Sequence, residues 1–209
     1  MITTQEPVVL QFGDISAKLD SAMREVGLVG WDIETDGLDF RKDAIRTCQL
    51  FVPGHEVEVV QLAPGRTPHR LVEALGSERV FTLFHHAMFD LRFMRYQWGA
   101  RARNVGCTKI ISKTALPHRK EHSLAGLTRE FLGHTMDKTE RLSDWGSSKL
   151  TSEQIAYAAN DAIVLPELYE QLWRHARERG VGDLIERSFS YIPVRVETDI
   201  RDCGDIFSY

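Results

Sequence analysis

The strongest constraint on the fold is a change in hydrophobic pattern between the two halves of the chain. The first half contains short apolar or β-branched runs separated by turn residues, and such runs favour strands. They lie at 8–12, 28–33, 45–52, 57–62 and 80–84. Apolar residues at three- and four-residue steps predict helices at 15–27, 71–75, 89–98, 110–116, 124–132 and 155–173. Strands that precede a mostly helical half indicate an α/β fold in which helices flank a mixed sheet.

Local signals refine some of these elements. Pro53-Gly54 predicts a turn, and therefore a hairpin formed by the strands on either side of it. Thr151 and Gln154 fit a capping box at the start of the last long helix. Pro166 predicts either a kink in that helix or the start of a second one, because proline cannot donate an interior hydrogen bond.

Composition sets the class of protein. The 209 residues are 43% hydrophobic and 27% charged, which is typical of a folded globular chain. No linker or repeat divides them, so we expect one domain over 1–209, with a core at about 28–175 and an extension at 187–209 of unassigned role. The three cysteines are too few and too dispersed for a disulfide scaffold, which favours a reducing compartment. No apolar run approaches the ~18 residues that span a bilayer. The N-terminus does not resemble a signal peptide, so we expect a cytoplasmic protein without membrane contact.

Charge constrains the partner. The formal net charge is −4, from 26 basic and 30 acidic side chains. Proteins that bind long nucleic acids along their backbone usually carry a basic excess. The balance therefore disfavours a tight binder of long nucleic acid, and leaves a local basic groove open.

The most informative motif is Asp32-Ile33-Glu34, at the end of a predicted strand. Residues two apart in a strand point to the same side, so Asp32 and Glu34 present two carboxylates on one face. Two ionised carboxylates repel each other, and a hard divalent cation relieves that repulsion. A solvated strand end is the alternative interpretation.

Two further segments supply acids. Asp90 follows the strand at 80–84, where a helix begins. The helix dipole alone also favours an acid there. Tyr157 and Asp161 lie four residues apart in a predicted helix and therefore share a face.

In this order the three segments resemble the motifs of the DEDD superfamily of 3′-to-5′ exonucleases, and Tyr157 is similar to the tyrosine of its DEDDy group. Further segments resemble nanoRNase C-type members of the ribonuclease D family. They are Cys107-Thr108-Lys109-Ile110-Ile111, His122-Ser123-Leu124, Leu132-Gly133, Ser143-Asp144-Trp145 and the chain end Asp205-Ile206-Phe207-Ser208-Tyr209.

The resemblance implies a ribonuclease H-like mixed sheet and a two-metal mechanism with Mg²⁺ or Mn²⁺. It implies that Asp32 bridges two divalent cations, that Glu34 and Asp161 bind the first, and that Asp90 holds the second through water. It further implies that Tyr157 orients the attacking water, and that nucleoside 5′-monophosphates leave the 3′ end of the substrate.

Expected substrate contacts follow from the same resemblance. Thr35, Gly37 and Leu38 come directly after the first motif and would approach the terminal nucleotide. For Leu38, a core leucine that anchors the turn is the alternative. His85 would contact a phosphate or ribose, and a structural hydrogen bond is its alternative. Lys109, Lys138 and Arg141 are candidates to neutralise phosphate, or simply charged helix surface. Trp145 is expected to be a packing anchor rather than a stacking platform.

The low basic charge and the nanoRNase C-like segments together favour short RNA, down to dinucleotides, as substrate. A stand-alone DNA exonuclease and a ribonuclease D-like enzyme that trims RNA 3′ ends are the alternatives. A non-catalytic nucleic-acid-binding module is disfavoured because all the acids are present, and a thiol hydrolase built on Cys107 lacks a neighbouring His–Asp pair. The resemblance also implies a homo-oligomer. Apolar residues of the extension would either form its interface or pack on their own subunit; they are Phe189, Tyr191, Ile192 and Val194.

Overall fold

The chain folds around one mixed six-stranded sheet, with strand order β1-β4-β3-β2-β5-β6. The structure is a computed structural model that describes residues 7–137 and 139–208, without the side chains of residues 141 and 142. The strands are β1 (Val8–Phe12), β2 (Leu28–Thr35), β3 (Ile45–Phe51), β4 (Val57–Gln61), β5 (Phe81–Phe84) and β6 (Val105–Cys107). The α-helices are α1 (Ala17–Val26), α2 (His69–Leu75), α3 (Ala87–Trp98), α4 (Thr108–Ala115), α5 (Leu124–Phe131), α6 (Ser152–Glu178) and α7 (Gly182–Ile200). A 3₁₀ helix, η1, covers Thr139–Leu142.

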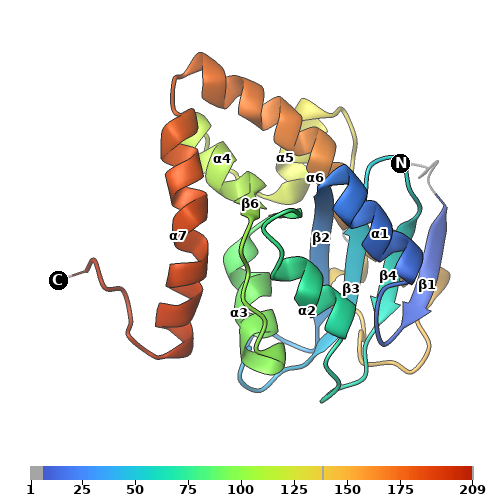
Figure 1. Ribbon diagram of the computed structural model, residues 1–209. Coiled ribbons are helices and arrows are strands. Elements are labelled where there is room, and N and C mark those ends of the chain that lie inside the picture. Colours follow the sequence, from blue (N-terminus) through green and yellow to red (C-terminus); the bar gives the residue numbers. More distant parts are fainter. Residues whose placement is uncertain (1–6, 138, 209) are drawn as a thin grey trace.

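The α/β class and the mixed sheet flanked by helices are confirmed (Figure 1). β3 pairs antiparallel with β2 and β4, which confirms the hairpin at Pro53-Gly54, whereas β5 runs parallel to β2 and to β6. Strand β6 was not expected. It has three residues, Val-Gly-Cys, too few to establish an alternating pattern, and it is specified by its pairing with β5.

Side chains along β2 point alternately to the two faces of the sheet. Trp31 and Ile33 lie in the larger hydrophobic core, which also contains buried residues of α1, α2 and α3. The opposite face of the sheet packs against α6, through a second core that joins β3 and β4 to Ala158, Ala159 and Ala162. The even-numbered residues of β2 thus face α6, and the first acidic motif lies on that side.

Gly30 allows α6 to approach β2 closely. A Cβ atom on Gly30 would lie 2.5 Å from the Ala162 carbonyl oxygen and 3.2 Å from Cδ of Pro166. Pro166 has no N–H to donate to that carbonyl, the acceptor four residues earlier. α6 nevertheless continues from Ser152 to Glu178, so a second helix starting at Pro166 is wrong.

The capping box at the start of α6 is confirmed. Thr151 Oγ1 accepts a hydrogen bond from the Gln154 amide at 3.1 Å, and Gln154 Oε1 accepts one from the Thr151 amide at 2.9 Å. These contacts fix where the helix begins, and hence which of its residues face β2.

The extension at 187–209 contains most of α7, a helix that was not predicted. Ile185, Phe189, Ile192 and Val196 are buried at steps of four, three and four, so a helical signal was present despite Pro193. Of the apolar residues singled out in this segment, Phe189 and Ile192 pack on their own subunit, whereas Val194 is exposed. Figure 1 shows α7 beside α3, with the following tail directed away from the sheet. Within residues 7–137 and 139–208, every helix is too short or too polar to serve as a transmembrane span.

Candidate active site

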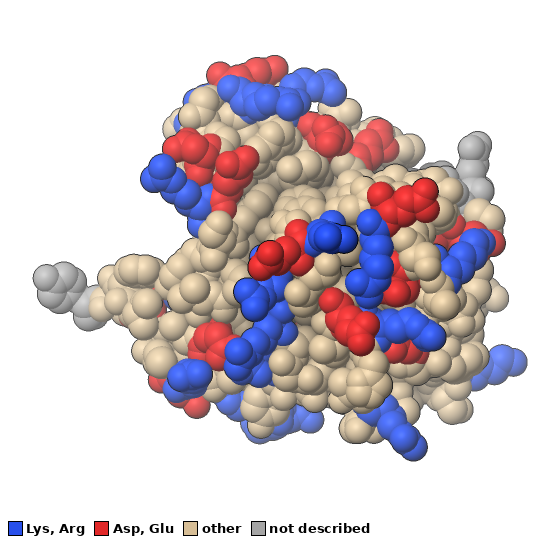
Figure 2. Space-filling model, in the orientation of Figure 1, with Lys and Arg blue, Asp and Glu red and all other residues tan. Residues whose placement is uncertain are grey.

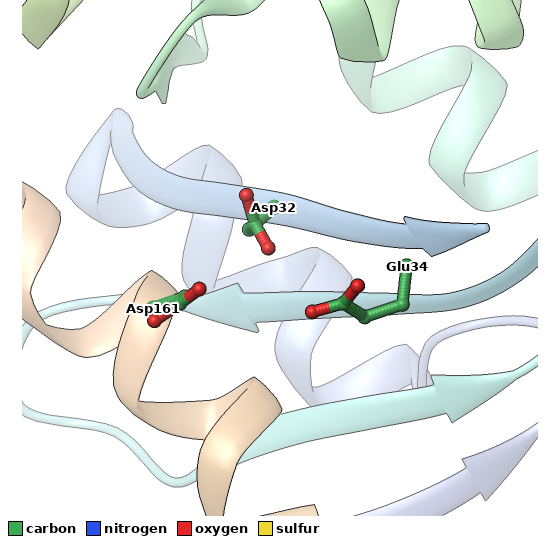
Figure 3. A group of neighbouring side chains, drawn as sticks. All are labelled: Asp32, Glu34 and Asp161. Carbon is green, nitrogen blue, oxygen red and sulfur yellow. The ribbon is translucent and has the colours of Figure 1, made fainter. Parts of the chain in front are cut away.

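Strand β2 and helix α6 bring three carboxylates together. Asp32 and Glu34 project from the same face of β2, and Asp161 projects from α6 (Figure 3). One carboxylate oxygen of each residue lies within 4.8 Å of the others, and all three side chains are half-buried. Figure 3 shows Glu34 and Asp161 directed toward the space beside Asp32. The sequence prediction that these acids meet is therefore correct for these three.

Asp90 approaches the same site from α3. It is 2% exposed and lines one cavity with Asp32 and Asp161. Burial and then the negative charge of Asp32 raise the pKa of Asp90 well above its usual value, against hydrogen bonds with the backbone at Asp90 and Ile33 that lower it. Asp90 lies outside the group of three mutually close carboxylates.

Burial opposes ionisation throughout the cluster. It raises the pKa of Asp32 to about 7, against a hydrogen bond with the Ile33 backbone that lowers it. Burial and then the charge of Asp32 raise the pKa of Asp161. Gln49, the partner of Asp32 in the β2–β3 register, places its amide nitrogen 3.5 Å from Asp32 Oδ2. An all-carboxylate set with such crowded charge fits a hard divalent cation, which prefers oxygen ligands.

Asp32, Asp90 and Asp161 line a cavity of about 310 Å³, whereas Glu34 lies outside its lining. Tyr157, one helical turn before Asp161, also lines it, and its ring lies 6.1 Å from that of Trp145. Trp145 is 3% exposed and belongs to the core beneath α6, so it is a packing anchor as expected. Tyr157 and Asp161 thus share the face of α6 that the spacing predicted.

His85 is held by a structural hydrogen bond. Its Nδ1 lies 2.8 Å from Thr108 Oγ1, which donates to the Phe84 carbonyl at 3.3 Å. Burial and the nearby charge of Lys109 lower the pKa of His85 to about 3, so the ring is neutral. His85 lines the cavity as well, so the hydrogen bond and a substrate contact are compatible.

The loop after β2 lies outside the lining of this cavity. Thr35 Oγ1 donates to the Gly37 carbonyl at 2.5 Å, which closes the turn, and a Cβ on Gly37 would collide with the Asp43 carboxylate. Leu38 is 84% exposed, so the interpretation of Leu38 as a core residue is wrong.

Other lining residues differ from the sequence expectations. Lys109 lines the cavity, Lys138 falls outside the described residues, and the Arg141 side chain is likewise not described. His86 was not singled out for this site, yet it lines the cavity and has φ of 70°, a left-handed conformation rare outside glycine. Cys107 is buried and its pKa is raised by burial, which is opposite to the activation that a thiol hydrolase needs.

Comparison with known proteins agrees with this geometry. A family model described as 3′-5′ exonuclease (DNA_pol_A_exo1) matches residues 11–177. The chain therefore belongs to this 3′-5′ exonuclease family. It is 27% identical over 144 residues to ribonuclease D of Nitrobacter hamburgensis, an alignment that covers 69% of this chain and 37% of the relative. The chain thus spans less than half the length of this curated relative.

Solved structures match over nearly the full length of the chain. Brucella melitensis NrnC bound to pGG has a TM-score of 0.90 and 28% identity, and the alignment covers 98% of this chain and 99% of that one. NrnC from the same organism with bound Mg²⁺ has a TM-score of 0.89 and 28% identity, with coverage of 97% and 99%. The resemblance inferred from the motifs, to the ribonuclease D family and its nanoRNase C-type members, is confirmed.

Proposed function

We propose that the protein is a metal-dependent 3′-5′ exonuclease that hydrolyses the terminal phosphodiester bond of short RNA and releases nucleoside 5′-monophosphates. The observation that carries this proposal is the convergence of Asp32, Glu34 and Asp161 within 4.8 Å, beside buried Asp90. Membership of the exonuclease family supports the reaction class.

The acids are the residues that would hold two divalent cations. Asp32 lies within 4.8 Å of Glu34 and Asp161, and its charge also acts on Asp90, so Asp32 would be the ligand that both cations share. When bound, divalent cations stabilise the charge on the reacting phosphate and lower the pKa of water. The Mg²⁺-bound NrnC structure supports magnesium as one such ion, and Mn²⁺ offers the same oxygen preference.

Tyr157 is proposed to orient the attacking water. A tyrosine hydroxyl has a pKa of about 10 and stays protonated near neutral pH, so it acts through a hydrogen bond rather than as a base. Its position one turn from Asp161 directs both groups into the same cavity.

Short RNA is the proposed substrate. NrnC, which matches this chain over nearly its whole length, was solved with pGG. The net charge of −4 disfavours extended backbone binding, and the small cavity leaves room for few nucleotides. We propose that Leu38 lies against the terminal base, supported by Thr35 and Gly37, and that neutral His85 and Lys109 approach the sugar-phosphate. Assembly into a homo-oligomer in the cytoplasm remains a prediction.

A time course on 5′-labelled RNA of two to about twenty nucleotides, with Mg²⁺, Mn²⁺ or chelator, tests the proposal. We expect metal-dependent loss of single nucleotides from the 3′ end, fastest for the shortest RNA. DNA of matched length forms a second arm, and faster DNA hydrolysis would favour the stand-alone DNA exonuclease. A preference for longer RNA would favour ribonuclease D-like trimming.

Asp161→Asn is the variant that tests whether Asp161 is a metal ligand. We expect turnover to fall at least about 10²-fold, because one ligand and its charge are lost. Asp183→Asn, which changes an exposed carboxylate on α7, is the matched control and should retain activity. Full metal-dependent turnover by folded Asp161→Asn protein would refute the assignment.

A further inference from the structure

A second cavity, of about 540 Å³, lies between α7 and the end of α3, and the described residues that line it are all different from those that line the carboxylate cavity. The loop between α3 and β6 closes one side of it. Its lining includes four arginines and one carboxylate, Glu197. The arginines are Arg95, Arg101, Arg103 and Arg201.

The arginines that line this cavity outnumber the carboxylates that form ion pairs with them. Arg95 and Arg201 both pair with Glu197, the second at 3.5 Å. Their charges, with that of Arg101, hold the pKa of Glu197 below its usual value, the Arg95 hydrogen bond contributing most. Arg103 forms an ion pair with Glu78 at 3.7 Å. Both side chains are exposed, so this ion pair contributes little to stability. Arg101 is exposed and makes no ion pair with any described residue.

The rest of the lining is apolar. Leu75, Leu91, Pro193 and Val196 line the cavity together with the arginines. In Figure 2, several Lys or Arg side chains, with Asp or Glu side chains among them, lie over the lower ends of α3 and α7, the two helices that Figure 1 shows beside each other. An apolar cavity with arginines at its rim suits an anion attached to an apolar body.

An adjoining cavity of about 300 Å³ extends this surface, since Arg103 lines both. Phe81, Tyr169 and Trp173 line it together with one carboxylate, that of Glu186. The rings of Tyr169 and Trp173 are stacked, with centroids 5.5 Å apart. All three rings are partly exposed, and Asn104 adds a hydrogen-bonding amide. Aromatic faces beside arginines are the features that proteins use to bind bases and phosphates together.

We propose that these adjoining cavities form a second nucleotide-binding site, in which Arg101 and Arg103 bind the phosphate and the aromatic cavity receives the base. The ligand is a nucleoside phosphate, supplied either as a free mononucleotide or as the 5′-phosphate end of an oligonucleotide. The site lies away from the carboxylates, so its occupancy does not require metal or turnover.

Calorimetry on the full chain in chelator, where no hydrolysis occurs, tests this site independently of the proposed nuclease activity. The probes are a nucleoside 5′-monophosphate, the unphosphorylated nucleoside, inorganic phosphate and a 3′-blocked, 5′-phosphorylated dinucleotide. We expect the monophosphate to bind more tightly than either phosphate or nucleoside. Tighter binding by the dinucleotide would identify the oligonucleotide end as the source, and equal or weaker binding would identify the mononucleotide.

The paired variant Arg101→Gln/Arg103→Gln removes the anion contacts at two exposed positions. We expect affinity to fall by about tenfold for each arginine, because charge-assisted hydrogen bonds to phosphate are lost. Arg66→Gln/Arg179→Gln, at exposed positions outside both cavities, is the matched control and should bind as the wild type does. Absence of binding by the wild type, or equal affinity in both paired variants, would overturn the proposal, as would equal affinity for monophosphate and inorganic phosphate.

Discussion

Replacing the central carboxylate should stabilise the metal-free protein while abolishing its activity. In Asp32→Asn the side chain keeps its shape but cannot ionise. Burial raises the pKa of Asp32 to about 7, so the folded chain resists ionisation of this group far more than the unfolded chain does. The native Asp32 side chain therefore destabilises the folded protein at every pH at which it is ionised.

The direction and magnitude of this stability change follow from the difference between the pKa values of Asp32 in the folded and unfolded states. The pKa of Asp32 is about 4 in an unfolded chain and about 7 in the folded protein, so the unfolded state binds fewer protons between these values. The free energy of unfolding thus falls as pH rises from about 4 to about 7, and levels off above that. Three pKa units correspond to about 4 kcal/mol. Since the side chain is only half-buried and water screens it, we expect the variant to gain about 2 kcal/mol at pH 8.

Urea unfolding in chelator, at pH 5 and pH 8, measures this effect. The stability advantage of Asp32→Asn should be larger at pH 8. Mg²⁺ should then stabilise the wild type more than the variant, because binding to the folded state shifts the unfolding equilibrium. Asp183→Asn, at an exposed position, should differ from the wild type by the same amount at both pH values. A variant that is less stable than the wild type at pH 8, or an advantage independent of pH, would refute the reasoning.

Three further substitutions distinguish effects on catalysis from effects on folding. Tyr157→Phe should lower kcat about 10²-fold through loss of water orientation, with Mg²⁺ affinity by calorimetry unchanged; an unaltered kcat would contradict the role. Leu38→Ala should leave stability within about 0.5 kcal/mol because the side chain is 84% exposed, but raise KM for RNA; an unchanged KM would exclude a substrate contact. Gly30→Ala places a Cβ 2.5 Å from the Ala162 carbonyl, so it should destabilise the fold by about 1–3 kcal/mol and weaken Mg²⁺ binding by displacing α6. Wild-type stability in that variant would show that α6 can shift freely.

The short-range patterns of the sequence correctly predicted most elements. The turn at Pro53-Gly54, the capping box of α6 and the two-residue spacing of Asp32 and Glu34 depend on neighbours in the chain, so they could be inferred without the fold. Strand β6 could not be inferred, because three residues carry no period and only pairing with β5 makes them a strand. Helix α7 did carry a readable period.

By itself, the sequence determined which residue types were available for chemistry, and in what order: an acid pair on one strand, an acid at a helix start, and a tyrosine four residues before another acid. The order of the motifs predicted by resemblance that Asp161 meets Asp32, but the physical cause of that contact lies in the tertiary structure. Gly30 lacks a Cβ, so α6 can lie against β2 at the turn of helix that carries Asp161. The exposure of Leu38 and the arginine-lined cavity beside α7 are also tertiary properties. They depend on contacts between segments that are far apart in the chain, and local periodicity contains no information about such contacts.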